Sequence, residues 1–272
     1  MNYLSFRGAG FSPRARNPYP RIAIMDSGLT AGPVIGPRDF ARVRWRRSGM
    51  TALILAIAFS SALAQDRDRA AALVSEYPLT NDDGSALPNH TVRLPGPIDR
   101  LAGVVVAANP GGKTTLYEFY DLNCPYCRAA SVDIATMVER NQDLRLVLVP
   151  YPVLGIPSIM ASRVELAVAK LGTPKQFYDF HRKIYAQRGT IDGTRALAVA
   201  HGLGLDQKAL TTAGDGDDIA EIMKNHLSLG NSLGLLVTPS FVIDGVALLG
   251  YPGPKPLRAI VDAVGTCGKV MC

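Results

Sequence analysis

The feature that most constrains this chain is a predicted strand that runs directly into two closely spaced cysteines. The stretch Leu116–Leu122 has the apolar content of a buried strand, and a helical pattern follows it from Pro125 to about Arg140. Cys124 and Cys127 therefore lie where the strand ends and the helix begins. Unpaired N–H groups and the helix dipole at such a place favour a thiolate on the first cysteine. We predict a redox-active disulfide between the two cysteines.

Each part of this Cys-x-x-Cys segment suits thiol exchange. The spacing lets the two sulfurs close a small ring with acceptable disulfide geometry. Pro125 fits the first helical turn, where its missing N–H is no loss, and Cys127 lies one turn in, placed to attack a mixed disulfide. Two alternatives stay open: an inert structural disulfide, or half of a zinc site completed by Cys267 and Cys272. The helix-opening position favours redox chemistry, and we predict no metal and no cofactor.

The order of the predicted elements indicates one α/β domain. The expected elements are strands at 104–106, 116–122 and 144–149, a helical stretch at 158–236 that glycines and prolines interrupt, strands at 240–243 and 246–249, and a helix at 255–264. The Asp244-Gly245 pair between two apolar runs is a strong signal for a β-hairpin. We therefore predict one α/β sheet with a helical insertion between its second and third core strands.

The positive net charge of the chain, +6, is confined to its N-terminal part. Residues 1–64 hold nine Arg and no Lys against two Asp, whereas residues 65–272 hold 20 basic and 21 acidic side chains. Binding to nucleic acid needs clustered cations that neutralise phosphates. Because the body of the chain lacks an excess of cations, we predict no nucleic-acid partner.

The same N-terminal part has the pattern of a secretory signal. Arg46 and Arg47 precede the uncharged apolar run Met50–Leu63, and the small residues Ala62 and Ala64 end the pattern. The run is shorter than the about 20 residues that cross a bilayer. We predict cleavage after Ala64 and a protein that is periplasmic or otherwise exported, without a stable membrane anchor. The alternative is an amphipathic or buried helix of the mature protein.

Three segments together resemble one known family. The segment Glu118–Cys127 resembles the active-site strand and helix of DsbA-type thiol:disulfide oxidoreductases in the thioredoxin superfamily. Tyr151–Gly155 is similar to that family's entry to its inserted helical domain, and Thr238–Gly245 to its cis-proline strand and hairpin. The resemblance covers about residues 104–265, and the conjunction of segments is more specific than Cys-x-x-Cys alone.

The resemblance implies a thioredoxin fold with an inserted helical domain. The implied parts are a leader and signal peptide at 1–64, an N-terminal extension at 65–103, the first part of the thioredoxin fold at 104–150, the helical insertion at 151–236, and the second part with the C-terminal tail at 237–272.

It also implies a role for each site residue. Cys124 would be the exposed nucleophile, Cys127 the buried resolving cysteine, and Glu118 a buried acid that exchanges protons near Cys127. Strand alternation places Glu118 on the same face as Tyr120 and Leu122; a surface acid on a strand edge is the alternative. Pro239 would be a cis-proline facing the disulfide, with a trans proline as the alternative. Thr238 would offer its backbone to an extended substrate peptide.

The direction of exchange stays open in the sequence. Pro125 and Tyr126 would border the substrate, and Tyr126 stands where the best-known oxidases of the family carry His. Because Tyr adds no positive charge, the Cys124 thiolate would be less stabilised and the enzyme less oxidising. We predict an oxidase of exported cysteine-containing proteins that a membrane redox partner resets. A reductase or isomerase, and a copper- or zinc-binding protein, are the alternatives.

Other parts of the chain carry weaker signals. Cys267 and Cys272 are expected to form a second disulfide, because an even cysteine count in an oxidising compartment favours pairing. Residues 70–77 show a short helical pattern, and the turn-rich sequence that follows reaches about residue 100. Surface or helix-packing roles are expected for the histidines, which are His90, His181, His201 and His226.

Overall fold

The structure is a computed structural model that describes residues 75–272. The predicted leader, its cleavage site after Ala64 and the helical pattern up to residue 74 lie outside the described residues. The last three residues of that pattern, Ser75–Tyr77, are not helical, so the prediction is wrong for them. Among the described residues, no helix combines the length and apolar content that a membrane crossing requires.

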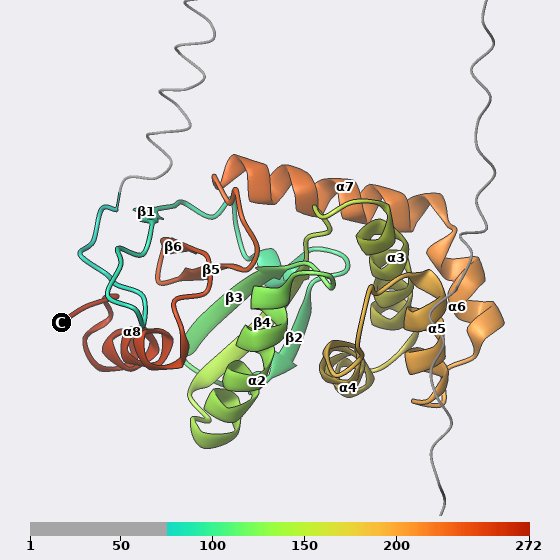
Figure 1. Cartoon of the computed structure of the whole chain (residues 1–272), viewed down its shortest axis with the longest axis horizontal. Helices are drawn as coiled ribbons and strands as arrows, with labels where there is room; N and C mark the ends of the chain where they lie inside the picture. The colour runs from blue at the N-terminus through green and yellow to red at the C-terminus, as the bar shows by residue number, and fades with distance from the viewer. Residues whose placement is uncertain (1–74) are drawn as a thin grey trace, which may run out of the picture. The chain divides into compact units, whose positions relative to one another are not determined.

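A six-stranded sheet forms the centre of the fold (Figure 1). Its strands are β1 (Asn89–Thr91), β2 (Val105–Ala108), β3 (Thr114–Tyr120), β4 (Leu144–Pro150), β5 (Ser240–Ile243) and β6 (Val246–Leu249). They are arranged in the order β1-β6-β5-β3-β4-β2. β3 is an inner strand that runs parallel to β4 and antiparallel to β5. The strand that leads into the two cysteines therefore has neighbours on both sides.

The hairpin between β5 and β6 forms where the Asp-Gly pair predicts it. Ile243 pairs with Val246, and the two residues between them both have positive φ, 47° at Asp244 and 72° at Gly245. Positive φ at both central residues is the requirement of the two-residue turn that matches the twist of paired strands. The predicted hairpin is thus confirmed.

Five helices follow β4 and precede β5 in the chain. They are α3 (Ile156–Leu171), α4 (Pro174–Tyr185), α5 (Gly193–His201), α6 (Gln207–Gly214) and α7 (Asp217–Ser232). Helix starts are marked by caps, such as the Thr173 hydroxyl and the Gln176 side chain, which satisfy each other's backbone N–H groups at α4. The predicted α/β class with a helical insertion is confirmed, although the helical part ends at Ser232 and not at residue 236.

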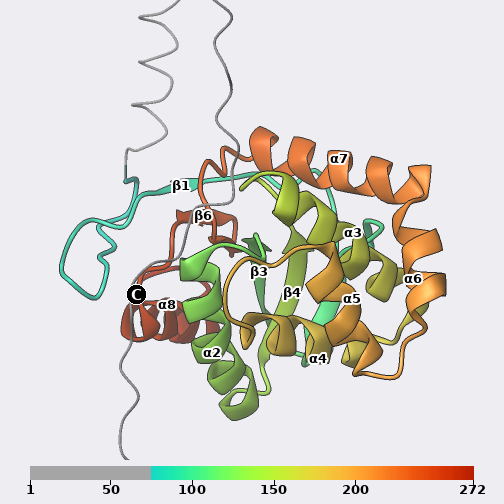
Figure 2. The ribbon, with the colours of Figure 1, turned by 45° about the vertical axis from the view of Figure 1, so that its right-hand side comes forward.

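Two hydrophobic clusters cover the two faces of the sheet. On one face, Leu116 and Tyr120 of β3 pack with α2 (Pro125–Arg140), α4 and α8 (Pro254–Cys267). On the other, Phe119 packs with the end of α7 and with the short 3-10 helix η1 (Ile98–Arg100). In Figures 1 and 2, α2 and α8 are neighbours, and α3 to α6 gather beyond the β4–β2 edge. Alternation along β3 therefore directs Tyr120 and Phe119 into different cores.

Strand β1 is a part of the fold that the sequence analysis missed. It adds to the sheet beside β6, within a segment predicted only as turn-rich. Buried Asn89 binds both the N–H and the carbonyl of Tyr77 through its side chain, at 2.9 Å each. Residues 75–77 therefore run alongside β1 in place of a helix. A strand of three residues is too short for its alternation to be recognised in the sequence.

Candidate active site

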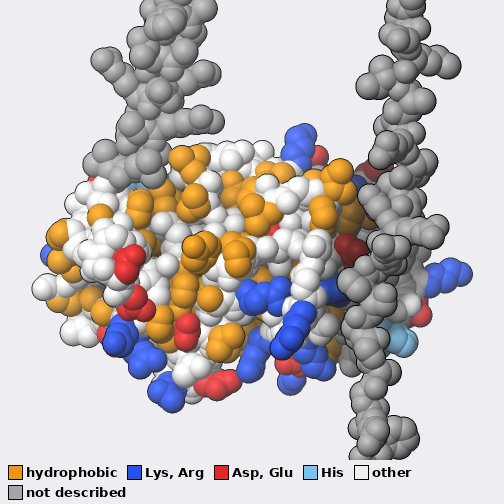
Figure 3. Space-filling model, viewed as in Figure 1, with side chains coloured by type: hydrophobic (Ala, Val, Ile, Leu, Met, Phe, Trp, Pro, Cys, Tyr) orange, Lys and Arg blue, Asp and Glu red, His pale blue; other side chains and the backbone are white. Residues whose placement is uncertain are grey.

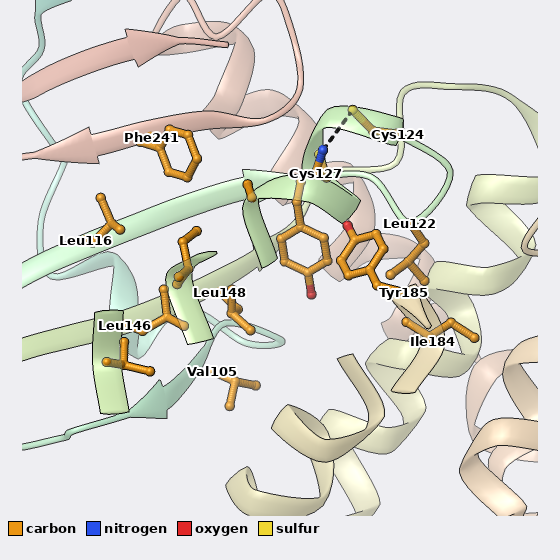
Figure 4. Close-up of a cluster of buried hydrophobic side chains, with 14 of the residues drawn as sticks. Val105, Leu116, Leu122, Cys124, Cys127, Leu146, Leu148, Ile184, Tyr185 and Phe241 are labelled. Carbon is orange, nitrogen blue, oxygen red and sulfur yellow. Dashed lines mark hydrogen bonds between the residues drawn. The ribbon is translucent and has the colours of Figure 1, made fainter. Parts of the chain in front are cut away.

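Cys124 caps the N-terminus of α2 with its sulfur. The Cys127 N–H donates to the Cys124 Sγ at 3.4 Å, and the Cys124 thiol donates to the Thr238 carbonyl oxygen at 3.0 Å. Figure 4 shows the first of these bonds, with Leu122 and Tyr185 in the same cluster of buried side chains. The first turn of α2 contains no acidic residue. The Sγ of Cys124 therefore lies at the positive end of a helix.

The pKa values of the two cysteines are shifted in opposite directions. Hydrogen bonding from Cys127, above all from its thiol, lowers the pKa of Cys124 to about 6 against the opposing effect of burial. Burial raises the pKa of Cys127 well above its usual value, and its hydrogen bond to Cys124 adds to that rise. At neutral pH, Cys124 is thus the thiolate and Cys127 the thiol, which is the division of roles that thiol exchange requires.

Cys124 is less accessible than the sequence analysis expects. The residue keeps 4% exposure, so the expectation of an exposed nucleophile is wrong for the described structure. Its contact with the Thr238 carbonyl, from a segment 114 residues away, covers a sulfur that a helix start alone would leave open. The neighbouring cleft of about 630 Å³ is lined by Tyr126, Val237 and Thr238, and by residues of the segments 81–83 and 249–253.

The lowered pKa of Cys124 predicts how its reactivity depends on pH. The rate of alkylation by iodoacetamide should rise with pH through a midpoint near 6 and level off above it, because only the thiolate reacts. The midpoint is measured by quenching at a series of pH values and counting the modified Cys124 by mass spectrometry. A midpoint near 8.5, the ordinary value of a free cysteine, would contradict this assignment.

Glu118 is a buried carboxyl group beneath the cysteines. It lies in β3 between Leu148 of β4 and Phe241 of β5, with no exposed surface. Neither carboxylate oxygen has a hydrogen-bond partner among the described residues. Burial raises the pKa of Glu118 to about 8, and the negative charges of Cys124 and Glu165 contribute further. A carboxyl group with such a pKa can hold or accept a proton near neutral pH.

The remaining predicted site residues lie around Cys124. The Thr238–Pro239 peptide bond is cis, and the Thr238 carbonyl contacts the Cys124 thiol. Pro125 is the first residue of α2, and the Tyr126 side chain is 66% exposed. The structure therefore brings together the segment that contains Cys124 and the loop that contains Thr238, which are 114 residues apart in the chain.

Two polar residues that the sequence analysis missed hold the active-site loop. Buried Asp121 accepts hydrogen bonds from the backbone N–H groups of Val153 and Leu154 and from the Ser158 hydroxyl, all within 2.9 Å. Asn123 exchanges two hydrogen bonds with the backbone of Ile191. These contacts attach the end of β3 to the inserted helices. The signal in the sequence is the presence of Asp and Asn directly after a strand that is mostly apolar.

The C-terminal cysteines are joined to each other. Cys267 and Cys272 form a disulfide with their Cα atoms 6.1 Å apart, at and beyond the end of α8. They are therefore not free to complete a zinc site with Cys124 and Cys127. Within residues 75–272, no group of three or more His, Cys, Asp or Glu side chains is arranged to hold a metal ion.

The histidines are scattered, as the sequence suggests, but two of them are buried. His226 lies between the carbonyl oxygens of Pro150 and Ala102 and thereby attaches α7 to the rest of the fold. His181 of α4 lies in the core beside Tyr120 and the carboxyl group of Glu165. The sequence alone does not single out Glu165, because one acid in a helical pattern is normally a surface residue.

Comparison with known proteins identifies relatives of this arrangement. Residues 115–264, more than half of the chain, match the model of a family described as "DSBA-like thioredoxin domain". A thioredoxin-like oxidoreductase from Silicibacter pomeroyi DSS-3 has a crystal structure similar to this one, with a TM-score of 0.57 and 29% identity over 63% of this chain and 99% of that one. The catalytic domain of Proteus mirabilis ScsC has a TM-score of 0.54 and 26% identity over 60% and 89%.

A match of a different kind involves part of a longer protein. The Na(+)/H(+) antiporter NhaA of Herminiimonas arsenicoxydans is 25% identical over 152 residues, which cover 55% of this chain and 24% of that protein. The matching region is thus about a quarter of that relative's length.

Proposed function

The chain belongs to the DSBA-like thioredoxin domain family, and we propose that it is an exported oxidase that introduces disulfides into cysteine-containing proteins through Cys124 and Cys127. Thiol–disulfide exchange is the general reaction of its relatives. The direction of exchange, the export and the partners are our proposal, as are the individual roles of the site residues.

The observation that carries the proposal is the state of Cys124 in the dithiol form. Its pKa is lowered to about 6 although no cation contacts its sulfur among the described residues, because hydrogen bonds from Cys127 and the start of α2 stabilise the thiolate. A stabilised thiolate stabilises the reduced protein, so the disulfide is a better electron acceptor. This supports oxidation of substrates even with Tyr126 in place of a histidine.

The reaction proceeds by two exchanges of sulfur partners. A substrate thiolate attacks the Cys124 sulfur, forms a mixed disulfide and breaks the Cys124–Cys127 bond, and Cys127 leaves with the electron pair and takes up a proton from Glu118. A second substrate thiolate attacks the substrate sulfur of the mixed disulfide, and Cys124 leaves as its stabilised thiolate. The substrate loses two electrons and gains a disulfide, and the enzyme gains both electrons and ends with Cys127 as a thiol and Cys124 as a thiolate.

The surface around Cys124 suits extended, partly apolar substrates. Large apolar side chains near it are exposed, and these are Tyr126, Val153, Leu154, Ile156, Leu236 and Val237. Val153 and Leu154 are placed there by Asp121, and Val237 precedes the Thr238 that contacts Cys124. Figure 3 shows hydrophobic side chains gathered across the middle of the face viewed in Figure 1. Backbone pairing at Thr238 would bind many sequences, because main-chain hydrogen bonds do not depend on the side chains.

Export and a membrane partner complete the proposal. The pattern of basic residues, the apolar run Met50–Leu63 and the Ala62-x-Ala64 ending supports a cleaved signal. An oxidase must be reoxidised after each turnover, and we propose a membrane redox protein as the acceptor of its electrons.

The redox equilibrium of the chain from residue 65 onward against glutathione tests the proposal. Thiols of Cys124 and Cys127 are trapped by acid, alkylated and counted by mass spectrometry across a series of glutathione ratios. We expect a reduction potential near or above about −150 mV, since strong oxidants of this chemistry lie near −120 mV. A value near about −250 mV would assign a reductase or isomerase instead. The proposal that this chain is an enzyme would be contradicted if Cys124 and Cys127 did not cycle between dithiol and disulfide, or if their thiols were isolated with bound metal.

A further inference from the structure

A second buried carboxyl group lies in the core that contains Glu118. Glu165 of α3 has no exposed surface, and the Tyr120 hydroxyl donates to its Oε1 at 2.7 Å. Its Oε2 has no hydrogen-bond partner among the described residues. A carboxyl group in such a place must be neutral, or must be paired with a positive charge, because an isolated buried carboxylate is very costly. The proton on Glu165 is therefore not independent of its neighbours.

Strand β3 connects the two carboxyl groups. Glu118 and Tyr120 are two residues apart and point to the same face of the sheet, and the hydroxyl of Tyr120 reaches Glu165. The negative charge of Glu165 is one of the causes that raise the pKa of Glu118, after burial and Cys124. Two acids in one low-dielectric core titrate as a coupled pair, because ionisation of one disfavours ionisation of the other.

A histidine from the inserted helices faces Glu165. The Nδ1 of His181 lies 3.9 Å from the Glu165 Oε1, within ion-pair range but beyond a hydrogen bond, and it has no other partner among the described residues. The ring packs edge-on against Tyr120 and Tyr185, with centroids 4.6 and 4.9 Å apart.

The surroundings contain few other charges. The titratable and charged groups around the two acids are Tyr120 and Asp121 on and after β3, Cys124, Cys127 and Arg128 on α2, Tyr178, His181, Arg182 and Tyr185 on α4, and Tyr251. Arg128 donates to the backbone carbonyls of Tyr185 and Gln187, and Arg182 lies over the Tyr178 ring. Of the basic groups in this set, His181 is the one in ion-pair range of Glu165.

We propose that Glu165, which accepts a hydrogen bond from Tyr120 and faces His181, is a positioning residue whose negative charge keeps a proton on Glu118 and thereby sets the pH range in which Cys127 is activated. The inference rests on the proposed function, because it concerns the proton that Cys127 exchanges with Glu118. In disulfide closure, the Cys127 thiol gives its proton to the Glu118 carboxylate, and the resulting thiolate attacks the Cys124 sulfur of a mixed disulfide. The Cys124–Cys127 bond forms, and the partner leaves with the electron pair.

The test separates the two cysteines by their kinetics. The reduced protein, with Cys267–Cys272 still joined, is mixed with an equimolar amount of 5,5′-dithiobis(2-nitrobenzoate). Cys124 releases the first thionitrobenzoate, and attack by Cys127 on the mixed disulfide releases the second. The rate of the second release rises with pH as Glu118 becomes a carboxylate that accepts the Cys127 proton, so its midpoint reports the pKa of Glu118.

In Glu165→Gln, we expect this midpoint to fall by about one pH unit or more. Two sites titrate as a coupled pair when their interaction shifts the pKa by about that much. The second release would then be roughly tenfold faster at a pH well below the midpoint. Tyr120→Phe removes the hydrogen bond that favours ionised Glu165, and should shift the midpoint in the same direction by a smaller amount. The matched control is Glu221→Gln, an acid on α7 whose side chain is 60% exposed, which should leave the midpoint unchanged.

Each outcome is informative. An unchanged midpoint in folded Glu165→Gln would overturn the inference while the wild type continues to exchange disulfides. If Glu165→Gln does not fold, an unchanged midpoint in Tyr120→Phe would overturn it. Absence of the second release in the wild type would contradict the proposed function, and the inference with it.

Discussion

Cys124→Ser should lower the rate of disulfide transfer to a reduced test protein by at least about a thousandfold, the scale on which loss of a nucleophile acts. A serine hydroxyl is not ionised at neutral pH and cannot form a mixed disulfide. Cys127→Ser should also lose transfer from its own disulfide, but with oxidised glutathione as the oxidant it should accumulate a glutathione mixed disulfide on Cys124, because the buried thiol that would displace the glutathione is missing. The two substitutions remove one sulfur each and should fail in different ways.

The measurement is the oxidative refolding of a reduced, disulfide-containing protein, followed by the return of its activity and by non-reducing electrophoresis. The matched control replaces both Cys267 and Cys272 with serine, which removes the exposed C-terminal disulfide and should leave the transfer rate close to that of the wild type. Transfer that survives in Cys124→Ser but is lost in the control would assign the chemistry to the C-terminal pair instead.

Glu118 should make the folded protein less stable as the pH rises. The pKa of its carboxyl is about 8 in the folded state and 4.5 in the unfolded chain, so between these values the folded state binds a proton that the unfolded state lacks. The free energy of unfolding then falls by about 1.4 kcal/mol per pH unit, or roughly 5 kcal/mol across the window. This contribution is complete below pH about 4.5 and is lost as the pH approaches 8. Glu118→Gln should abolish it.

Urea unfolding of the wild type and of Glu118→Gln at a series of pH values from 4.5 to 8 measures this effect. The quantity to compare is the difference between the two proteins, since Cys124 has the opposite sign: its lowered pKa stabilises the folded dithiol as the pH rises from about 6 toward 9. As the pH rises across the series, the free energy of unfolding of Glu118→Gln should increase by several kcal/mol relative to that of the wild type. A difference that stays constant with pH would mean that Glu118 has no raised pKa. Glu221→Gln again supplies an exposed control.

Local patterns in the sequence were sufficient for much of this fold. The Asp244-Gly245 hairpin, the breaks between the inserted helices and the helix that starts after Cys124 depend on residues close together in the chain. Turn geometry, capping and the N-terminal position of proline act over a few residues, so they can be read without tertiary information. The two cysteines and their place at a helix start are determined in the same way.

Contacts between distant segments were decided by the tertiary structure. Strand β1 forms because Asn89 and its neighbours pair with β6. The low exposure of Cys124 accompanies the contact of its thiol with the Thr238 carbonyl. The pairing of Tyr120 with Glu165 joins residues 45 apart in sequence. No local pattern shows which buried group will meet which, because that depends on how whole helices pack on the sheet. The sequence by itself thus determined the helix start and the chemistry of its two sulfurs, whereas the packing of distant elements decided the proton affinities around them.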